Sequence, residues 1–411
     1  MLTPKSSKAL LHRLSNGSSN VNYHPWNARS KPLGFRVIFA LEFLAVLVLS
    51  ISFVPMARAD LVVVATIPIG HAVAGEAYDS GKGEVFVADY NSKTVSVISD
   101  ITPNLVATIP VGTNPYGVAY DSGKGEVFVT NYGSGTVSVI SDVTNTVVAN
   151  ITVGRPYGIA YDGGKGEVFV ANNEGLALST VSVISDATNA VVATVNVGKG
   201  AHGVAYDSGK GVVWVTNWNS ATVSVISDAT NTVVATVNVG LGPEGLAYDN
   251  NKGEVFVAND GQSNTSTDTV TVISDTGYIV VATITVGGFP CGVAYDSGTH
   301  EVFVTNSGQG FGNTVSVISD FTNTVVANVT VGTGPCGVAY DSGKSWVFVS
   351  NGGGAPAGNT VSVISDGGTT VGGRVLAVDK LALVAPYVGL IAAMLAAVTA
   401  YVTLNRSNKK R

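Results

Sequence analysis

The sequence predicts an all-β protein, a seven-bladed β-propeller of four-stranded antiparallel blades. The main observation is a phrase, Gly-Val-Ala-Tyr-Asp-Ser-Gly-Lys-Gly-Glu-Val-Phe-Val-Thr-Asn, that recurs with small changes along most of the 411 residues. A period of about 40–45 residues with four short strands per copy is typical of propeller blades. Seven copies, spaced 41 to 47 residues apart, are marked by Tyr78, Tyr120, Tyr161, Tyr206, Tyr248, Tyr295 and Tyr340.

Each repeat contains four short runs of strand-forming residues. In one stretch they are residues 105–111, 117–121, 126–131 and 136–142, each bounded by Gly, Asn, Asp or Pro. These residues turn the chain, so each run reads as a strand between turns. Val127 and Val129 share one face and Phe128 takes the other, so the strand is apolar on both sides. Such strands fit blades packed between two neighbours.

The propeller is expected to cover residues 60–369 and to close on itself. A Val-Val-Ala-Thr-Ile type strand precedes the first copy, whereas its counterpart after the last copy is broken by Gly372-Gly373. We therefore expect residues 61–69 to supply the outer strand of the seventh blade. Such closure protects the edges that an open repeat would expose.

The chain ends predict a membrane-anchored protein. Residues 1–59 combine a long basic segment, an apolar run over 37–54 and Ala57-Arg58-Ala59. This pattern is typical of a signal peptide cleaved after Ala59, although Glu42 inside the run leaves an uncleaved signal anchor open. Residues 370–380 read as a linker. Residues 381–404 carry no charge over 24 positions, enough to cross a hydrocarbon core of about 30 Å.

The basic tail, residues 405–411, is expected to stay in the cytoplasm by the positive-inside rule. The propeller then lies on the extracellular face of the cell membrane. Between Asp60 and Asp366 the sequence has 26 acidic and 9 basic residues. An acidic body repels polyanions, so we expect no nucleic-acid partner.

One end of the blades is nearly uniform. It gathers aspartates that could form a cation-binding ring or could each hydrogen-bond their own turn. Their repetition in every copy favours the turn interpretation. The fourteen are Asp79, Asp121, Asp162, Asp207, Asp249, Asp296, Asp341, Asp100, Asp142, Asp186, Asp228, Asp275, Asp320 and Asp366.

The other end varies between blades and is the predicted site. We call the residue just before each inner-strand glycine the mouth position, because inner strands line a propeller's channel. Binding functions usually lie on variable loops held by a rigid scaffold. Tyr132, Trp218 and Phe311 add aromatic side chains near these positions. The mouth positions are Ala74, Tyr116, Tyr157, His202, Glu244, Cys291 and Cys336.

From this set we predict a ligand site made of Tyr116, Tyr157, His202, Glu244 and Trp218. No catalytic residue, bound metal or cofactor is predicted, because Ser and Asp recur as turn residues in every copy.

The two cysteines, Cys291 and Cys336, occupy equivalent positions in adjacent copies. A disulfide is the economical interpretation for a secreted domain; free thiols and a metal site completed by His202 and Glu244 remain alternatives. Three Asn-x-Ser/Thr sequences are glycosylation acceptors if the compartment glycosylates, at Asn150, Asn264 and Asn328.

The repeated segment also resembles a known family. Val-Phe-Val-Thr-Asn at 127–131 and 302–306, and Val-Trp-Val-Thr-Asn at 213–217, are similar to the motif of the YVTN β-propeller repeat family. That family includes archaeal surface-layer-type propellers and periplasmic YncE-like proteins. The resemblance implies an extracytoplasmic binding or structural protein with no shared catalytic constellation.

The function expected from the sequence is therefore non-enzymatic. The chain would be a membrane-anchored surface-layer, adhesion or ligand-binding module that meets other surface proteins or glycans through its variable loops. The alternative is an extracytoplasmic enzyme or a metal or redox protein at the channel mouth, using His202, Glu244, Cys291 and Cys336.

Overall fold

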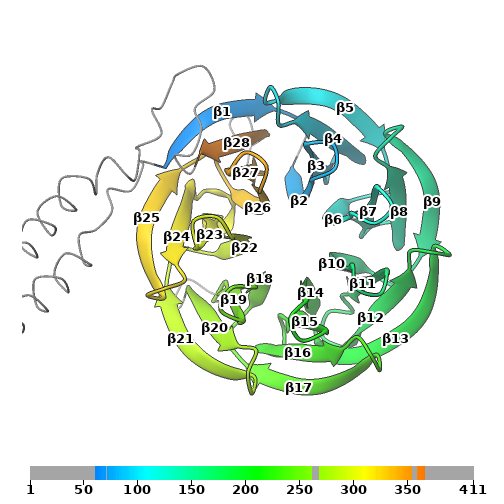
Figure 1. The fold of residues 1–411 in the computed structure, drawn as a ribbon, viewed down its shortest axis with the longest axis vertical. Helices are drawn as coiled ribbons and strands as arrows, with labels where there is room; N and C mark the ends of the chain where they lie inside the picture. Colours follow the sequence, from blue (N-terminus) through cyan, green and yellow to red (C-terminus); the bar gives the residue numbers. More distant parts are fainter. Residues whose placement is uncertain (1–60, 71, 262–267, 354–358, 366–411) are drawn as a thin grey trace, which may run out of the picture. The chain divides into compact units, whose positions relative to one another are not determined.

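The computed structural model describes residues 61–70, 72–261, 268–353 and 359–365. In these residues, seven four-stranded antiparallel sheets form blades around a central channel (Figure 1). The predicted propeller and its number of blades are confirmed. The predicted signal segment, linker 370–380, span 381–404 and tail 405–411 lie outside the described residues. Within the described part of the chain, no helix has the length and apolar character needed to cross a membrane.

Each blade runs from an inner strand at the channel to an outer strand at the rim. The inner strands are β2 (Val73–Asp79), β6 (Pro115–Asp121), β10 (Pro156–Asp162), β14 (Ala201–Asp207), β18 (Pro243–Asp249), β22 (Pro290–Asp296) and β26 (Pro335–Asp341). The second strands are β3 (Glu84–Asp89), β7 (Glu126–Asn131), β11 (Glu167–Asn172), β15 (Val212–Asn217), β19 (Glu254–Asn259), β23 (Glu301–Asn306) and β27 (Trp346–Asn351).

The third strands are β4 (Thr94–Ser99), β8 (Thr136–Ser141), β12 (Leu178–Ser185), β16 (Thr222–Ser227), β20 (Thr269–Ser274), β24 (Thr314–Ser319) and β28 (Thr360–Ser365). The outer strands are β5 (Asn104–Pro110), β9 (Thr146–Thr152), β13 (Ala190–Lys199), β17 (Thr232–Asn238), β21 (Ile279–Thr285), β25 (Thr324–Thr330) and β1 (Val62–Pro68). One 3₁₀ turn, η1 (Gly308–Gly310), follows β23. Blades 1 to 6 are β2–β5, β6–β9, β10–β13, β14–β17, β18–β21 and β22–β25.

Blade 7 combines the two ends of the propeller. Strand β1 pairs antiparallel with β28, with Val62 opposite Ser365 and Pro68 opposite Thr360. The sheet order is β1-β28-β27-β26, so the N-terminal strand completes the last blade (Figure 1). This confirms the predicted closure of the ring by residues 61–69. Because β28 runs towards the turns after the inner strands, Val62 and Ser365 both lie at that face.

The core lies between neighbouring blades. Phe86 of blade 1 is fully buried and packs with Val118 and Val127 of blade 2. Phe128, on the opposite face of the same strand as Val127, packs with Ile159 of blade 3. Each second strand is therefore sandwiched between two blades, which explains why it is apolar on both faces.

Glycine and threonine allow the blades to meet closely at the channel. A Cβ built on Gly158 would lie 2.2 Å from the His202 carbonyl oxygen, so only glycine fits there. The Thr216 hydroxyl, in the Val-Trp-Val-Thr-Asn segment, donates to the Glu244 carbonyl of the next blade at 2.7 Å. The same hydroxyl accepts from its own blade's Gly203 amide at 2.7 Å. We call this contact the hydroxyl staple.

The hydroxyl staple is present at four of the seven junctions between blades. The other donors are Thr130 to Tyr157, Thr305 to Cys336 and Ser350 to Ala74. At the three remaining junctions the position is Ala88, Ala171 or Ala258. Each acceptor is the carbonyl of a mouth position, so the staples fix the backbone at the channel mouth.

The aspartates at the opposite face, the turn face, fall into two groups. Those after the inner strands cap their own turn, as expected: Asp79 Oδ1 accepts the Gly81 and Lys82 amides at 2.7 and 3.1 Å. In the second group, Asp100 accepts the Tyr78 hydroxyl at 3.2 Å, from the inner strand of the same blade. Asp275 of this group does accept the Thr276 hydroxyl of its own turn at 3.0 Å. The turn interpretation therefore missed the tyrosine partners of this group, and Asp366 lies outside the described residues.

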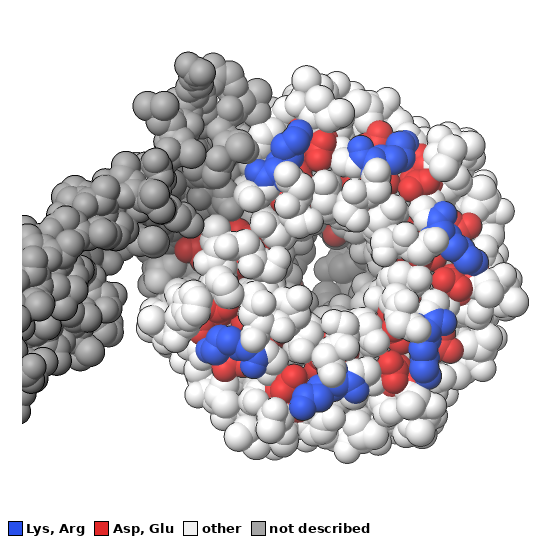
Figure 2. Space-filling model, viewed as in Figure 1, with Lys and Arg blue, Asp and Glu red and all other residues white. Residues whose placement is uncertain are grey.

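Lysines on this face join six of the seven blades to the next blade. Lys82 of blade 1 donates to the Asp142 carbonyl of blade 2 at 2.6 Å, and Lys344 of blade 7 donates to the Asp100 carbonyl of blade 1 at 2.9 Å. Figure 2 shows these basic side chains beside acidic ones around the central opening, with an interruption over blade 6. There Thr299 replaces the lysine found in the other six copies.

Candidate functional site

The mouth positions gather around the channel as the sequence predicts. A cavity of about 150 Å³, the channel cavity, is lined by Tyr116, His202, Glu244, the two cysteines, inner-strand glycines and a ring of aliphatic residues. A second cavity of about 330 Å³, the mouth cavity, is lined by Tyr132, Tyr157, Asn173, His202, Trp218, Asn219 and Glu244. His202 and Glu244 line both, so the two cavities adjoin at these side chains.

An aromatic cluster occupies one side of the mouth. The Tyr116 and Tyr157 ring centroids lie 4.5 Å apart, and the Tyr157 and His202 centroids are also 4.5 Å apart. Tyr132 meets Tyr157 edge-on at 4.9 Å, and Tyr90 meets Tyr116 at 6.4 Å. Rings in these arrangements stabilise one another and form a rigid cluster.

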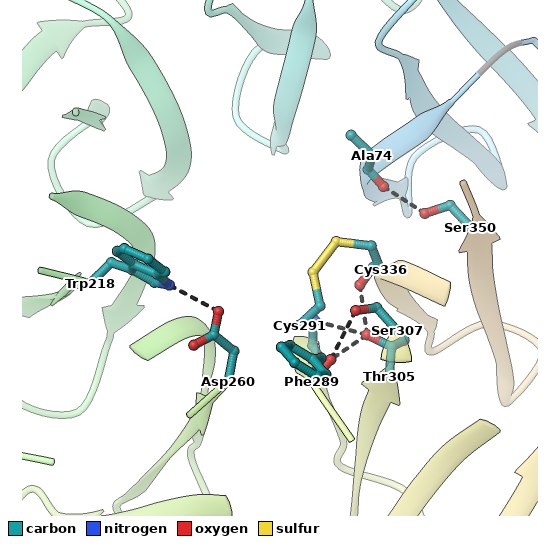
Figure 3. Close-up of a disulfide and its surroundings, with 10 residues drawn as sticks. Ala74, Trp218, Asp260, Phe289, Cys291, Thr305, Ser307, Cys336 and Ser350 are labelled. Carbon is teal, nitrogen blue, oxygen red and sulfur yellow. Dashed lines mark hydrogen bonds between the residues drawn. A yellow bond between two sulfur atoms is a disulfide. The ribbon is translucent and has the colours of Figure 1, made fainter. Parts of the chain in front are cut away.

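Polar groups lie beside the aromatic cluster. The Trp218 indole Nε1 donates to Asp260 Oδ2 at 3.1 Å, which joins the loops of blades 4 and 5 (Figure 3). At the rim, the Arg155 guanidinium lies 5.4 Å from the Tyr132 ring centroid, a cation–π distance. The site thus combines fixed aromatic faces with carboxyl and amide groups.

The two cysteines form a disulfide. Cys291 on β22 and Cys336 on β26 are bonded, with their Cα atoms 5.1 Å apart, so blades 6 and 7 are linked covalently at the mouth (Figure 3). Disulfide sulfurs are not thiolates and do not ligate metal as cysteine does. Among the described residues, no group of three or more His, Cys, Asp or Glu side chains could hold a metal ion.

Burial keeps the ionisable groups of the mouth uncharged near neutral pH. Burial raises the pKa of Glu244 to about 8, and the nearby Asp260 charge adds to the shift. Burial lowers the pKa of His202 to about 4, so its imidazole is neutral. Burial raises the pKa of Tyr157 to about 12, with smaller contributions from Tyr132 and Tyr90.

Glu76 is a functional candidate that the sequence analysis missed. It lines the channel cavity, is 9% exposed, and neither carboxylate oxygen has a hydrogen-bond partner of ordinary geometry among the described residues. Burial raises its pKa to about 8, while the backbone amides of Ala339 and Ser350 oppose the shift. In the other six copies the same position holds Val118, Ile159, Val204, Leu246, Val293 and Val338.

The remaining predicted residues are placed as follows. Tyr132 and Trp218 line the mouth cavity, but Phe311 is 85% exposed and lines neither cavity. Asn150 and Asn328 are exposed on outer strands, where each side-chain oxygen accepts a serine hydroxyl. Asn264 lies outside the described residues. Asn173 and Asn219 were not predicted.

Comparisons with known proteins show the fold class. No family model matches the chain, and no curated protein matches it. Among solved structures, a chain of the Kuenenia stuttgartiensis hydrazine synthase is similar, with a TM-score of 0.62 and 17% identity. The match covers 76% of this chain and 98% of that chain. At this identity the likeness shows a β-propeller and nothing of its chemistry. The resemblance to the YVTN family therefore rests on the repeat motifs alone.

Proposed function

We propose that this chain is a non-enzymatic ligand-binding propeller, displayed on the cell surface as the YVTN resemblance implies and anchored in the cell membrane by the apolar segment 381–404. It binds its ligand through the variable loops at the channel mouth. The observation that carries this proposal is the meeting of Tyr157, His202, Trp218 and Glu244, from three consecutive blades, around one cavity.

The uniformity of the rest of the molecule supports the assignment of binding to the mouth. The turn face repeats the same capping contacts from blade to blade, and the aspartates that make them recur in every copy. At the mouth, by contrast, seven blades present five different residue types at one position. Variable side chains on a rigid scaffold are the usual arrangement of a binding surface.

The path of the chain supports display of this surface away from the membrane. Val62 and Ser365 pair at the turn face, opposite the mouth. Both ends of the described propeller therefore leave it at the face opposite the mouth. The disulfide also suits an oxidising, extracytoplasmic compartment.

Binding is tested on the full-length protein in detergent, screened by thermal shift against sugars, amines, amino acids and short peptides. A ligand of the mouth should lose most of its stabilising effect in Trp218→Ala and Tyr157→Ala. It should keep that effect in Phe321→Ala, which removes a 70% exposed aromatic side chain on the turn face. Binding that survives both mouth substitutions would place the site elsewhere.

Surface display is tested on intact cells. A peptide tag inserted between Asn145 and Thr146, in a turn-face loop, should be reached by an externally added antibody. A tag after Arg411 should be reached only after permeabilisation, because the basic tail is proposed to be cytoplasmic. The reverse pattern, or equal access to both tags, would contradict the proposal.

The alternative function is an extracytoplasmic enzyme at the same mouth. It is favoured by Glu244 and His202, since a carboxylic acid with its pKa raised to about 8 and a neutral imidazole line one cavity. Glu244→Gln separates the two functions. A binding module keeps its ligand with altered affinity, whereas an enzyme loses turnover while still binding substrate.

A further inference from the structure

The channel contains two acidic side chains where the repeat supplies mostly apolar ones. Glu76 replaces an aliphatic residue on the inner strand of blade 1, and Glu244 takes a mouth position in blade 5. Both line the channel cavity of about 150 Å³. Glu76 is nine-tenths buried, and neither oxygen makes a hydrogen bond of ordinary geometry among the described residues; the backbone amides of Ala339 and Ser350 only partly offset its burial. A buried polar group without a partner costs free energy, so its presence calls for a ligand.

The side chains around these carboxyls fit a positive group. Among the described residues, no Lys or Arg lines either cavity. Tyr116, Tyr157 and His202 instead present aromatic rings at the mouth, with centroids 4.5 to 5.7 Å apart. Aromatic faces attract cations electrostatically, most strongly where water is excluded.

An organic ammonium ion fits this lining better than a metal ion does. Metal ions require several clustered oxygen, nitrogen or sulfur donors, and the described residues contain no such group. The channel offers carboxyls, rings and aliphatic side chains such as Val118, Leu246 and Val338. Carboxyls and rings suit the charge of an alkylammonium, and the aliphatic ring suits its methyl groups.

We propose that the channel and mouth cavities bind a small methylated ammonium compound, with Glu76 and Glu244 as its counter-ions and the tyrosine cluster as its aromatic wall. The inference rests on the proposed function and names the ligand class of that site. Quaternary ammonium groups are a known use of aromatic cages in proteins.

Binding of such a cation must release protons. Burial raises the pKa of both Glu76 and Glu244 to about 8, so the empty site is protonated at neutral pH. A cation binds the ionised carboxylates and displaces these protons. Affinity should therefore rise as pH increases towards 8, by about tenfold per pH unit for each proton released, and level off above it.

Tyr116, Tyr157 and His202 do not change charge in that pH window. Tyr116, which faces Glu244, has its pKa raised well above 10, and the pKa of Tyr157 is about 12. The imidazole of His202 is neutral above about pH 4. Asp260, beside Glu244, accepts the Trp218 indole. Of the strands packed against β2, β3 carries Glu84 and Asp89, β6 carries Tyr120 and Asp121 besides Tyr116, β26 carries Tyr340 and Asp341, and β27 carries no ionisable residue. The Glu76 strand itself carries Tyr78 and Asp79.

The test uses choline, which has no titratable proton, and dimethylbutanol, its neutral carbon analogue. Calorimetry on the full-length protein in detergent should show choline binding with proton release, seen as different heats in phosphate and Tris buffers. Dimethylbutanol should bind at least about tenfold more weakly, because it matches the shape but lacks the charge. Equal binding of the two compounds, or no proton release, overturns the proposal.

Variants assign the counter-ions. Glu76→Val restores the residue type of the other copies and should weaken choline binding about tenfold or more while keeping the fold. Glu244→Gln should weaken it similarly, and the two together should abolish the pH dependence. Glu84→Gln is the control, since this carboxyl of the same blade pairs with Lys82 at 3.0 Å on the turn face. Unchanged affinity in Glu76→Val overturns the assignment.

The result also separates this inference from the proposed function. If choline does not bind but a neutral ligand from the screen binds and depends on Trp218, the ammonium class is wrong and the binding module stands. If no ligand depends on the mouth side chains, both are wrong.

Discussion

Single residues in this protein are informative when they depart from the repeat. Glu76 is the clearest case, because the six equivalent residues are aliphatic and its carboxyl is buried without a hydrogen-bond partner of ordinary geometry among the described residues. The departure could be read from the aligned copies. Glu76 was not predicted because the candidate site was built only from the mouth positions, two residues earlier, where the side chain varies in most blades.

The pH dependence of stability should report Glu76 directly. Its pKa rises from the ordinary 4.5 to about 8 on folding, so the folded chain keeps a proton that the unfolded chain loses. That contribution is fully present below pH 4.5 and is lost as pH rises towards 8. Glu76→Val should therefore gain stability over the wild type across this window, by up to a few kcal/mol.

Urea unfolding of the wild type and of Glu76→Val between pH 5 and 8 measures the difference in their free energies of unfolding. Glu84→Gln serves again as the control and should follow the wild type. A constant difference between Glu76→Val and wild type at all pH values would contradict the shifted pKa.

Backbone conformation marks a second group of unusual residues. The last residue of the turn after each inner strand has a positive φ; it is Gly125 in blade 2 but Ser345 in blade 7, at φ 56°. A side chain in this left-handed conformation costs roughly 1 kcal/mol. Ser345→Gly should raise the free energy of unfolding by up to that amount.

The reverse change supplies the control for this prediction. Gly125→Ala should destabilise the protein, because the new Cβ would lie 2.6 Å from Asp142 Oδ2. Denaturant titration of the two variants should give changes of opposite sign. A loss of stability in Ser345→Gly would show that the serine side chain makes a contact that outweighs the strain.

The candidate site could be predicted in part, for a physical reason. Mouth residues such as His202 and Glu244 lie on regular strands, so aligning the copies places them at one height in the channel. Asn173 and Asp260 lie in loops of different length, where the repeat gives no register. Their contribution to the mouth depends on loop geometry that spacing does not determine.

At the scale of the elements, the Thr of the repeated motif acts between strands of different blades. The Thr216 hydroxyl on β15 donates to the Glu244 carbonyl on β18 and accepts the Gly203 amide on β14. The sequence analysis used this residue only as part of the repeated motif and assigned it no contact. Its role depends on the distance between blades, which only the closed ring defines.

Removing one staple should weaken a single junction. Thr216→Val keeps the shape of the side chain but leaves the buried Gly203 amide and Glu244 carbonyl without this partner, at a cost of about 1–3 kcal/mol. Ala171→Ser should add the missing staple between blades 3 and 4, because Ser350 already makes the bond at the equivalent position.

Chemical denaturation measures both effects, and choline affinity shows whether the staple also positions Glu244. If Thr216→Val were as stable as the wild type, the hydroxyl would contribute nothing to the contact between blades.

At the scale of the whole molecule, the junction between blades 6 and 7 differs from the others. It lacks the turn-face lysine, because blade 6 has Thr299 there, and it has the disulfide at the mouth. The crosslink encloses a chain segment with a sequence separation of 45 residues. The disulfide therefore links the two blades whose junction lacks the lysine contact on the turn face.

Loss of the disulfide should open this junction first. Cys291→Ser with Cys336→Ser should lower the free energy of unfolding by about 2–4 kcal/mol through the unfolded chain's entropy. Amide hydrogen exchange should rise in β22, β23, β26 and β27 before other blades. Lys124→Met, at a junction without a crosslink, is the control and should cost less than about 1 kcal/mol. Uniform exchange in all blades would argue against a local weak point.

The fold itself followed from the repeat, because each copy cannot bury both faces of its second strand unless it packs between two others. Phe86 and Phe128 show this requirement, each fully buried against the following blade. The tyrosine partners of the second set of aspartates, such as Tyr78 for Asp100, were missed because they are distant in sequence.

The pairing of Val62 with Ser365 gives the ring a mechanical property. Both strands leave the propeller at the same end of one ladder, so a pull that separates the two chain ends loads its hydrogen bonds one after another. Such peeling opens a ladder at much lower force than sliding the strands past each other does. Tension applied between the two ends would therefore detach β1 first and leave blades 1 to 6 folded. Blade 7 is then the part of the molecule that opens first under force.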